Sequence, residues 1–230
     1  MCYHIGTEMM NIKNNSNSHQ QYVRYYIEKG TSFSMLNKAL LKDKAIATIV
    51  GGQIMTRITV KDENNEPIAE KRRVITPKAI LSDGTIDVAE IPTEKLKVVA
   101  DSNKLTAVGD IVIKLSTPYD SAIITEESAG CLIPSFCAII RCNGINREYL
   151  QAFLSTSHCK NQLKNQVAGA MMPLLSVGKL GNVEVPLPDQ EEQQRIGEGY
   201  IKTQEKLVAL KRILELEAMK NDLIFKELVK

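Results

Sequence analysis

The last 45 residues of this 230-residue chain differ sharply from the rest. An extended segment with two prolines, residues 185–188, leads directly into a helical pattern that continues to the end of the chain. Proline lacks an N–H and pushes its predecessor toward extended geometry, so helix is excluded upstream. Asp189 is a good N-cap, and Glu192 stands where a capping box requires it. We therefore predict that a globular body ends here and that one long helix covers residues 189–230.

A spacing of four and three residues runs along this helix, as in a coiled coil. Seven of its ten positions are apolar, which favours a seam that pairs with another helix. A straight helix of this length would span roughly 60 Å and has no core of its own, so it needs a partner. The alternative is a helix folded back on its own body. Asn221 is polar and can fix the register of a pairing. The residues expected in dimerisation are Ile196, Tyr200, Leu207, Leu210, Leu214, Asn221, Ile224 and Leu228.

Length and composition are those of one substantial domain with an appendage. Hydrophobic residues make up 43% of the chain, which is ordinary for a globular protein. No apolar run approaches the roughly 18 residues of a membrane span, and the polar, Asn- and Ser-rich start lacks a secretion signal. We expect a cytoplasmic protein with no membrane contact. Its expected parts are a polar, mobile leader (1–21), a body (22–188) and the long helix (189–230).

The five cysteines form no C-x-x-C pair, and their number is odd. Neither a disulfide framework nor a zinc site is indicated, so we expect no metal and a reducing cytosol. Cys131, Cys137 and Cys142 lie in a mainly apolar stretch and are expected to be buried thiols. The net charge of +2 is compatible with nucleic-acid contact but does not require it.

Short β-rich runs separated by turn residues fill most of the body, with one late helical stripe. This pattern predicts an α+β fold with a mostly antiparallel, β-rich body. Residues 61–73 are expected to be a charged loop and residues 82–85 a turn. The expected strands are residues 46–50, 54–60, 74–76, 111–115, 122–125, 136–141, 174–177 and 183–185, and the expected helices are residues 22–27, 35–41 and 146–166.

Catalytic motifs are missing from the sequence. It contains no Gly-rich phosphate loop, no G-x-S-x-G elbow and no Asn/Asp-Pro-Pro-Tyr/Phe motif. His158 adjoins Cys159, but neighbours on a helix point about 100° apart and are poorly placed to share a proton. A surface histidine is the favoured interpretation. The sequence thus favours a binding protein without a cofactor over an enzyme with an unrecognised site.

Four segments resemble the DNA-specificity subunit of type I restriction–modification systems. The most specific is residues 185–188, Val-Pro-Leu-Pro, followed by Glu192, Gln193 and Ile196 and then the long helix. The other three are the β-rich stretch 46–52, the Gly-Asp-Ile-Val-Ile segment at 109–113, and the helix 149–166 followed by Gly169 and residues 174–180. Together the four segments cover about residues 41–230.

The resemblance implies a target recognition domain that reads one half of a split site in double-stranded DNA. It implies no catalysis, because an adenine methyltransferase (modification) subunit, and possibly a restriction subunit, would supply the chemistry. Usual members carry two recognition domains and two long helices, whereas this chain has one of each and is similar to a half-length form. Two copies joined through antiparallel C-terminal helices would restore the usual layout and read a palindromic, interrupted site. Pairing with a different half-subunit is the alternative.

Candidate DNA-binding residues come from side-chain chemistry. Arg and Lys suit phosphate and guanine, Asn and Gln suit adenine, and hydroxyls are general donors. Each candidate could instead be ordinary solvated surface, and a coiled-coil adaptor that binds another protein through its body remains the alternative function. The three candidate groups are Lys71, Arg72 and Arg73 in the charged loop; Lys114, Ser116, Thr117 and Tyr119; and Gln53, Thr56 and Arg57.

Overall fold

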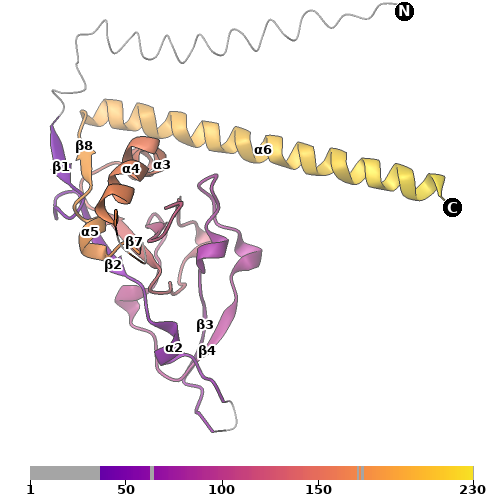
Figure 1. Cartoon of the computed structure of the whole chain (residues 1–230), viewed down its shortest axis with the longest axis horizontal. Coiled ribbons are helices and arrows are strands. Elements are labelled where there is room, and N and C mark those ends of the chain that lie inside the picture. Colours follow the sequence, from indigo (N-terminus) through magenta and orange to yellow (C-terminus); the bar gives the residue numbers. More distant parts are fainter. Residues whose placement is uncertain (1–36, 63–64, 170, 172–173, 230) are drawn as a thin grey trace, which may run out of the picture. The chain divides into compact units, whose positions relative to one another are not determined.

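The computed structural model describes residues 37–62, 65–169, 171 and 174–229 (Figure 1). The chain divides into two compact units, one made of residues 1–38 and 186–188 and the other of residues 39–185 and 189–230. The expected leader and the expected helix 22–27 lie outside the described residues. The division into leader, body and helix stays a prediction.

A four-stranded antiparallel sheet forms the centre of the second unit. Its order is β2 (Ala47–Gly51), β7 (Cys137–Cys142), β5 (Ile111–Lys114) and β6 (Ser121–Ile123). The two central strands are rich in isoleucine and valine, which fit a pleated surface covered on both faces. Residues 111–113 and 137–140 are buried. The prediction of an antiparallel, β-rich body is confirmed.

A two-stranded ribbon of β3 (Glu70–Arg73) and β4 (Thr93–Leu96) carries its own small core. That core consists of Val74, Leu96 and Leu132, and side chains of the one-turn helix α2 (Met55–Ile58) pack against it. We call α2, β3 and β4 the ribbon lobe. Bridges from residue 53 to residue 134 and from residue 74 to residue 132 join the lobe to the segment that leads into β7.

The late helical stripe forms two helices, α3 (Arg147–Ser155) and α4 (Ser157–Gln166). Thr156 separates them because its backbone is extended, with ψ 149°. Its hydroxyl donates to the Phe153 carbonyl, and the Cys159 N–H donates to it in turn. One threonine therefore ends α3 and caps α4, which the 3.6-residue periodicity alone does not reveal.

The long C-terminal helix is α6 (Gln190–Leu228), and its prediction is confirmed. The Asp189 carboxylate accepts from the Glu192 N–H at 2.9 Å, as expected of an N-cap. The first turns of α6 pack against α3, whereas every described residue from 205 to 229 is exposed (Figure 1). A membrane-crossing helix is not found among the described residues.

Five local predictions are wrong. The expected strand 74–76 is reduced to one isolated bridge at Val74. Residues 38–40 form β1 (Lys38–Leu40), which pairs with β8 (Glu184–Pro186), where a helix was expected. Part of the charged loop is β3, and its partner β4 was missed. Residues 55–58 form α2 in place of a strand, closed by the Thr59 N–H on the Met55 carbonyl. No strand forms at residues 174–177: residues 174–176 are irregular, and residue 177 begins the helix α5 (Val177–Leu180) because Ser176 caps it. The short helices η2 (Pro77–Ala79), η3 (Val88–Glu90), η4 (Ser102–Lys104) and η5 (Glu126–Ser128) complete the described elements.

Candidate nucleic-acid interface

The fold brings two of the three candidate groups into the ribbon lobe. Gln53, Thr56 and Arg57 lie in and before α2, while residues 71–73 are in β3. The Lys97 N–H donates to the Ile58 carbonyl at 2.9 Å, which ties α2 to the ribbon. Figure 1 shows α2 beside β3 and β4. Residues far apart in sequence thus share one small lobe.

The basic triplet lies in a strand, so its side chains alternate between the two faces of the ribbon. On one face, Arg72 forms an ion pair with Glu70 and donates to the Gly130 carbonyl at 3.4 Å. Glu94 stands opposite Arg72 in the register. Arg72 is therefore half-buried and held by its own chain, and its assignment to DNA binding stays a prediction.

Lys71 belongs to the other face of the ribbon, with Arg73. Its cross-strand partner is Lys95, and like charges placed directly opposite each other destabilise a sheet. Lys71 is exposed and, among the described residues, forms no ion pair; the same holds for Arg57 on α2. This face of the lobe carries positive charge that a polyanion would neutralise.

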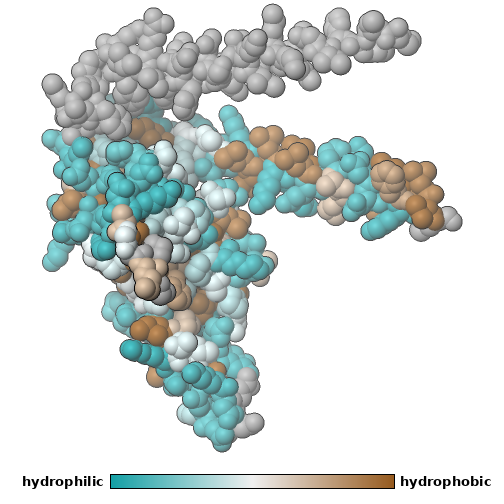
Figure 2. Space-filling model, viewed as in Figure 1, coloured by the Kyte–Doolittle hydropathy of each residue, from teal (hydrophilic) through white to brown (hydrophobic). Residues whose placement is uncertain are grey.

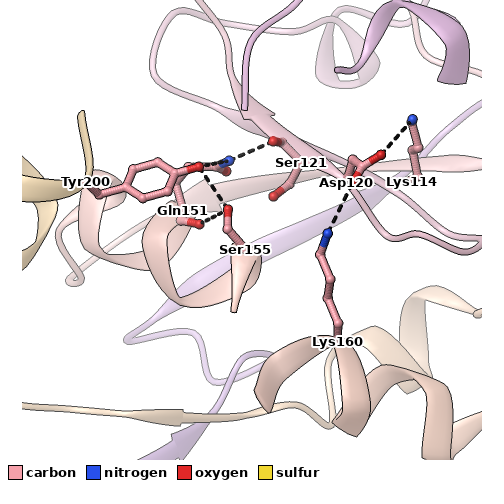
Figure 3. Close-up of polar contacts among 7 residues, drawn as sticks. All are labelled: Lys114, Asp120, Ser121, Gln151, Ser155, Lys160 and Tyr200. Atoms are coloured by element: carbon pink, nitrogen blue, oxygen red, sulfur yellow. Dashed lines mark hydrogen bonds and ion pairs between the residues drawn. The ribbon is translucent and has the colours of Figure 1, made fainter. Parts of the chain in front are cut away.

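The third candidate group lies elsewhere, between β5 and β6 at the edge of the sheet away from β2. The Lys114 ammonium is 3.0 Å from one oxygen of Asp120, and the Lys160 ammonium is 3.1 Å from the other (Figure 3). The Asp120 side chain is only 5% exposed. Lys114 is thus committed to an internal ion pair, unlike Lys71.

Tyr119 is completely buried, with its backbone in the left-handed region at φ 58°. Its ring has no exposed face for a base or a phosphate. Ser116 is half-buried and Thr117 exposed, so only these two members of the group present surface. The structure does not join this group to the ribbon lobe, and the lobe is the better candidate.

The expected dimerisation residues fall into two sets along α6. Ile196 and Tyr200 are half-buried near the start of the helix, and Tyr200 bonds to the body of its own chain. Their assignment to the seam is therefore unsupported. The remaining positions are exposed and form a half-seam that nothing in the described structure covers: Leu207, Leu210, Leu214, Asn221, Ile224 and Leu228.

A second apolar face on α6 was missed by the sequence reasoning. Leu216, Met219 and Leu223 are between 48% and 60% exposed. Leu223 follows Leu214 by nine residues, which at 3.6 residues per turn turns it to the opposite side of the helix. Figure 2 shows brown, apolar surface along α6 out to its C-terminal end. The sequence did contain a signal for this face. Its apolar residues occupy heptad positions that would face solvent in a two-helix coiled coil, where polar residues are expected.

The thiols are chemically quiet. Cys131, Cys137 and Cys159 are buried and Cys142 is half-buried, so its expected burial is only partial. Burial raises the pKa of Cys137 and Cys159 to about 12. His158 is exposed while Cys159 is buried, which gives no activated Cys–His pair. The described residues hold no cluster of three metal-ligating side chains.

Comparison with known families decides what this arrangement belongs to. The family model of the type I restriction modification DNA specificity domain matches residues 65–218, from just before β3 into the exposed part of α6. This chain belongs to that family. The match includes the ribbon strands β3 and β4, strands β5, β6 and β7 of the sheet, α3, and α6 as far as residue 218. We call α6 the rod. The resemblance in the sequence is confirmed.

Solved structures share the fold of this specificity domain. An HsdS subunit from Thermoanaerobacter tengcongensis is similar with a TM-score of 0.55 and 22% identity, covering 80% of this chain and 46% of that one. A chain from a structure on complex assembly and conformational transition of the type I R-M system has a TM-score of 0.55 and 19% identity, covering 94% and 53%. The chain thus spans about half the length of both. No curated protein matches it by sequence.

Proposed function

We propose that this chain is a sequence-specific DNA-binding half-subunit that directs a type I adenine methyltransferase or restriction complex to a bipartite site. The observation that carries the proposal is the family match, which covers strands β3 and β4 of the ribbon lobe and most of α6. The exposed Lys71 and Arg57 supply charge for phosphate contacts, which position a protein on the duplex. The chain itself would carry no catalysis.

Two copies would pair through the half-seam with their α6 helices antiparallel. Each helix is held by its body at the N-terminal end only, so antiparallel pairing places the two bodies at opposite ends of the rod. The exposed part of α6 runs from residue 205 to residue 228. It spans roughly 35 Å at 1.5 Å per residue, about the length of ten base pairs. That separation suits two half-sites one helical turn apart, read by a two-fold dimer.

The second apolar face is then available to the methyltransferase subunit. Leu216, Met219 and Leu223 lie opposite the half-seam, so a helix of another subunit can pack there without displacing the second copy of this chain. Their exposure would be costly in an isolated dimer, since apolar surface left in water forfeits about 25 cal/mol per Å². The rod would therefore serve as spacer and as docking surface.

Methylation mapping tests the proposal directly. One strain of a host without adenine methylation would carry this gene together with a type I methyltransferase gene from the same genome. A second strain would carry the methyltransferase gene alone. We expect one palindromic, interrupted adenine motif only when both genes are present. The same methylation in both strains, or none in either, would exclude a specificity role.

DNA binding by the purified chain with its methyltransferase gives a second test. Affinity for duplex should fall steeply with salt because phosphate contacts release counterions. An adaptor that binds only proteins would instead not be retained on a column of immobilised duplex at physiological salt.

A further inference from the structure

The first turns of α6 cross the start of α3 at close range. The Asn146 N–H donates to the Gln193 side-chain oxygen at 3.0 Å. One turn later, Gly197 passes so near that a Cβ would lie 2.8 Å from the Asn146 side-chain oxygen and 2.9 Å from the Tyr149 amide nitrogen. Both contacts lie at the start of α3, within residues 146–149, so they act as a single pivot. They fix the position of the rod but leave its direction open to pivoting.

Tyr200, one turn further on, supplies a second point. Its hydroxyl lies 2.9 Å from the Ser155 Oγ and 3.4 Å from the Gln151 Nε2 (Figure 3). Ser155 uses its single proton on the Gln151 carbonyl, so Tyr200 must be the donor to Ser155. The Gln151 Nε2 is a donor only. It donates one hydrogen to Tyr200 and the other to the Ser121 carbonyl at 2.7 Å.

This chain of hydrogen bonds runs from the rod into the sheet. Gln151 is only 1% exposed, and Ser121 is the first residue of β6. Beyond Tyr200 a groove of about 990 Å³ opens between α6 and the body. There the described residues of α6 make one ion pair with the body, Lys211 to Asp83 at 3.9 Å, and it is exposed. Tyr200 is thus the last buried polar tie that resists pivoting of the rod.

We propose that the Tyr200–Ser155–Gln151 link fixes the direction in which the recognition body leaves the rod, and so sets the spacer length accepted between the two half-sites. This inference rests on the proposed function. Tyr200 is a positioning residue: it touches no DNA and leaves the half-site sequence unchanged. It acts on specificity through the distance between the two lobes.

A small rotation is enough for such an effect. A point about 20 Å from a pivot moves by about 3.5 Å in a 10° turn, which is close to the 3.4 Å rise of one base pair. In a two-fold dimer both bodies turn together, which doubles the change in separation. A loosened link therefore admits spacers one or two base pairs away from the native length.

Methylation mapping of Tyr200→Phe and Ser155→Ala tests the inference. Tyr200→Phe keeps the ring and removes the hydroxyl, and Ser157→Ala, an exposed serine two residues away, is the matched control. We expect both link variants to keep the half-site sequences while methylation at neighbouring spacer lengths rises several-fold, with Ser157→Ala unchanged. If both link variants keep the single native spacer, the inference is overturned and the proposed function stands. A native chain that directs no methylation defeats the proposed function itself.

A second readout does not depend on DNA. Spin labels on unnatural amino acids at the exposed positions 99, in the body, and 215, on the rod, report the distance between body and rod. We expect the distance distribution of the full chain to broaden in Tyr200→Phe and to remain narrow in Ser157→Ala. Equal widths in the two variants, at matched thermal stability, would show that the link does not hold the rod.

Discussion

At the scale of single residues, the two faces of the β3–β4 ribbon assign different roles to adjacent basic side chains. Lys71 and Arg57 are exposed, so Lys71→Ala with Arg57→Ala should weaken duplex binding without lowering the free energy of unfolding. Each lost phosphate contact lowers the slope of log affinity against log salt by about 0.9. Fluorescence anisotropy over a salt series measures this slope. Lys44→Ala, at an exposed turn residue outside the lobe, is the control.

Arg72→Ala should have the opposite profile. It leaves Glu70 without its ion-pair partner and frees the Gly130 carbonyl, so the free energy of unfolding should fall by about 1–3 kcal/mol. The salt slope of DNA binding should stay unchanged in the folded protein. A reduced slope at native stability would place Arg72 in the interface instead.

The buried thiols predict how stability depends on pH. The pKa of Cys159 is about 12 in the folded chain, against 9.0 for a free thiol, because burial disfavours the thiolate. This contribution to stability is complete below pH 9 and is lost as pH rises toward 12, at up to about 1.4 kcal/mol per pH unit for each thiol. Urea unfolding at pH 8, 9 and 10 should show the fall. Cys159→Ala should make it shallower, and an identical slope would contradict the assignment.

At the scale of elements, two glycines on α6, two residues apart and so on nearly opposite sides of the helix, make a matched pair. A Cβ on Gly199 meets nothing within 4 Å, so Gly199→Ala should stabilise the helix by about 0.5–1 kcal/mol. A Cβ on Gly197 would approach the Tyr149 backbone, and Gly197→Ala should lower stability by about 1–3 kcal/mol. Chemical denaturation measures both changes. If the two variants change stability equally, α6 is not docked on α3 as described.

Sequence patterns found the elements whose cause is local. The proline segment, Asp189 and the apolar period located α6, and runs of isoleucine and valine located β5 and β7. The pattern failed where long-range pairing decides. Residues 38–40 are a strand because β8 lies beside them, although more than 140 residues separate the two in sequence. Met55 is in a helix because its carbonyl accepts the Thr59 N–H, whatever the β-branched neighbours prefer.

The candidate site was only partly predictable for the same reason. Residue chemistry selected Lys71, Arg57 and Lys114 alike, because all three are basic and lie beside β-rich runs. Only the fold shows that Asp120 holds Lys114, while Lys71 remains exposed. Tyr200 matched the apolar period, yet its hydroxyl bonds to α3. Periodicity indicates which side of a helix a residue occupies and cannot identify what covers that side.

At the scale of the whole molecule, mutations on the two faces of α6 should have different effects. Leu214→Glu places a charge in the half-seam and should convert the proposed dimer to a monomer. Leu223→Glu places the same charge on the opposite face and should leave the dimer intact while methyltransferase binding is lost. Light scattering and co-purification measure the two properties. If Leu223→Glu also dissociates the dimer, one face serves both partners.

Anchoring of α6 at one end has a consequence for protein engineering. In an antiparallel pair of half-seams, the final turn of each helix lies beside residue 207 of the other copy, roughly 25 Å along the rod from the start of that copy's α6. A linker that covers this distance would therefore suffice to join two copies head to tail in one continuous polypeptide. Such a tandem gene could then diverge in one lobe alone, and the symmetric reader would become one that accepts two unrelated half-sites.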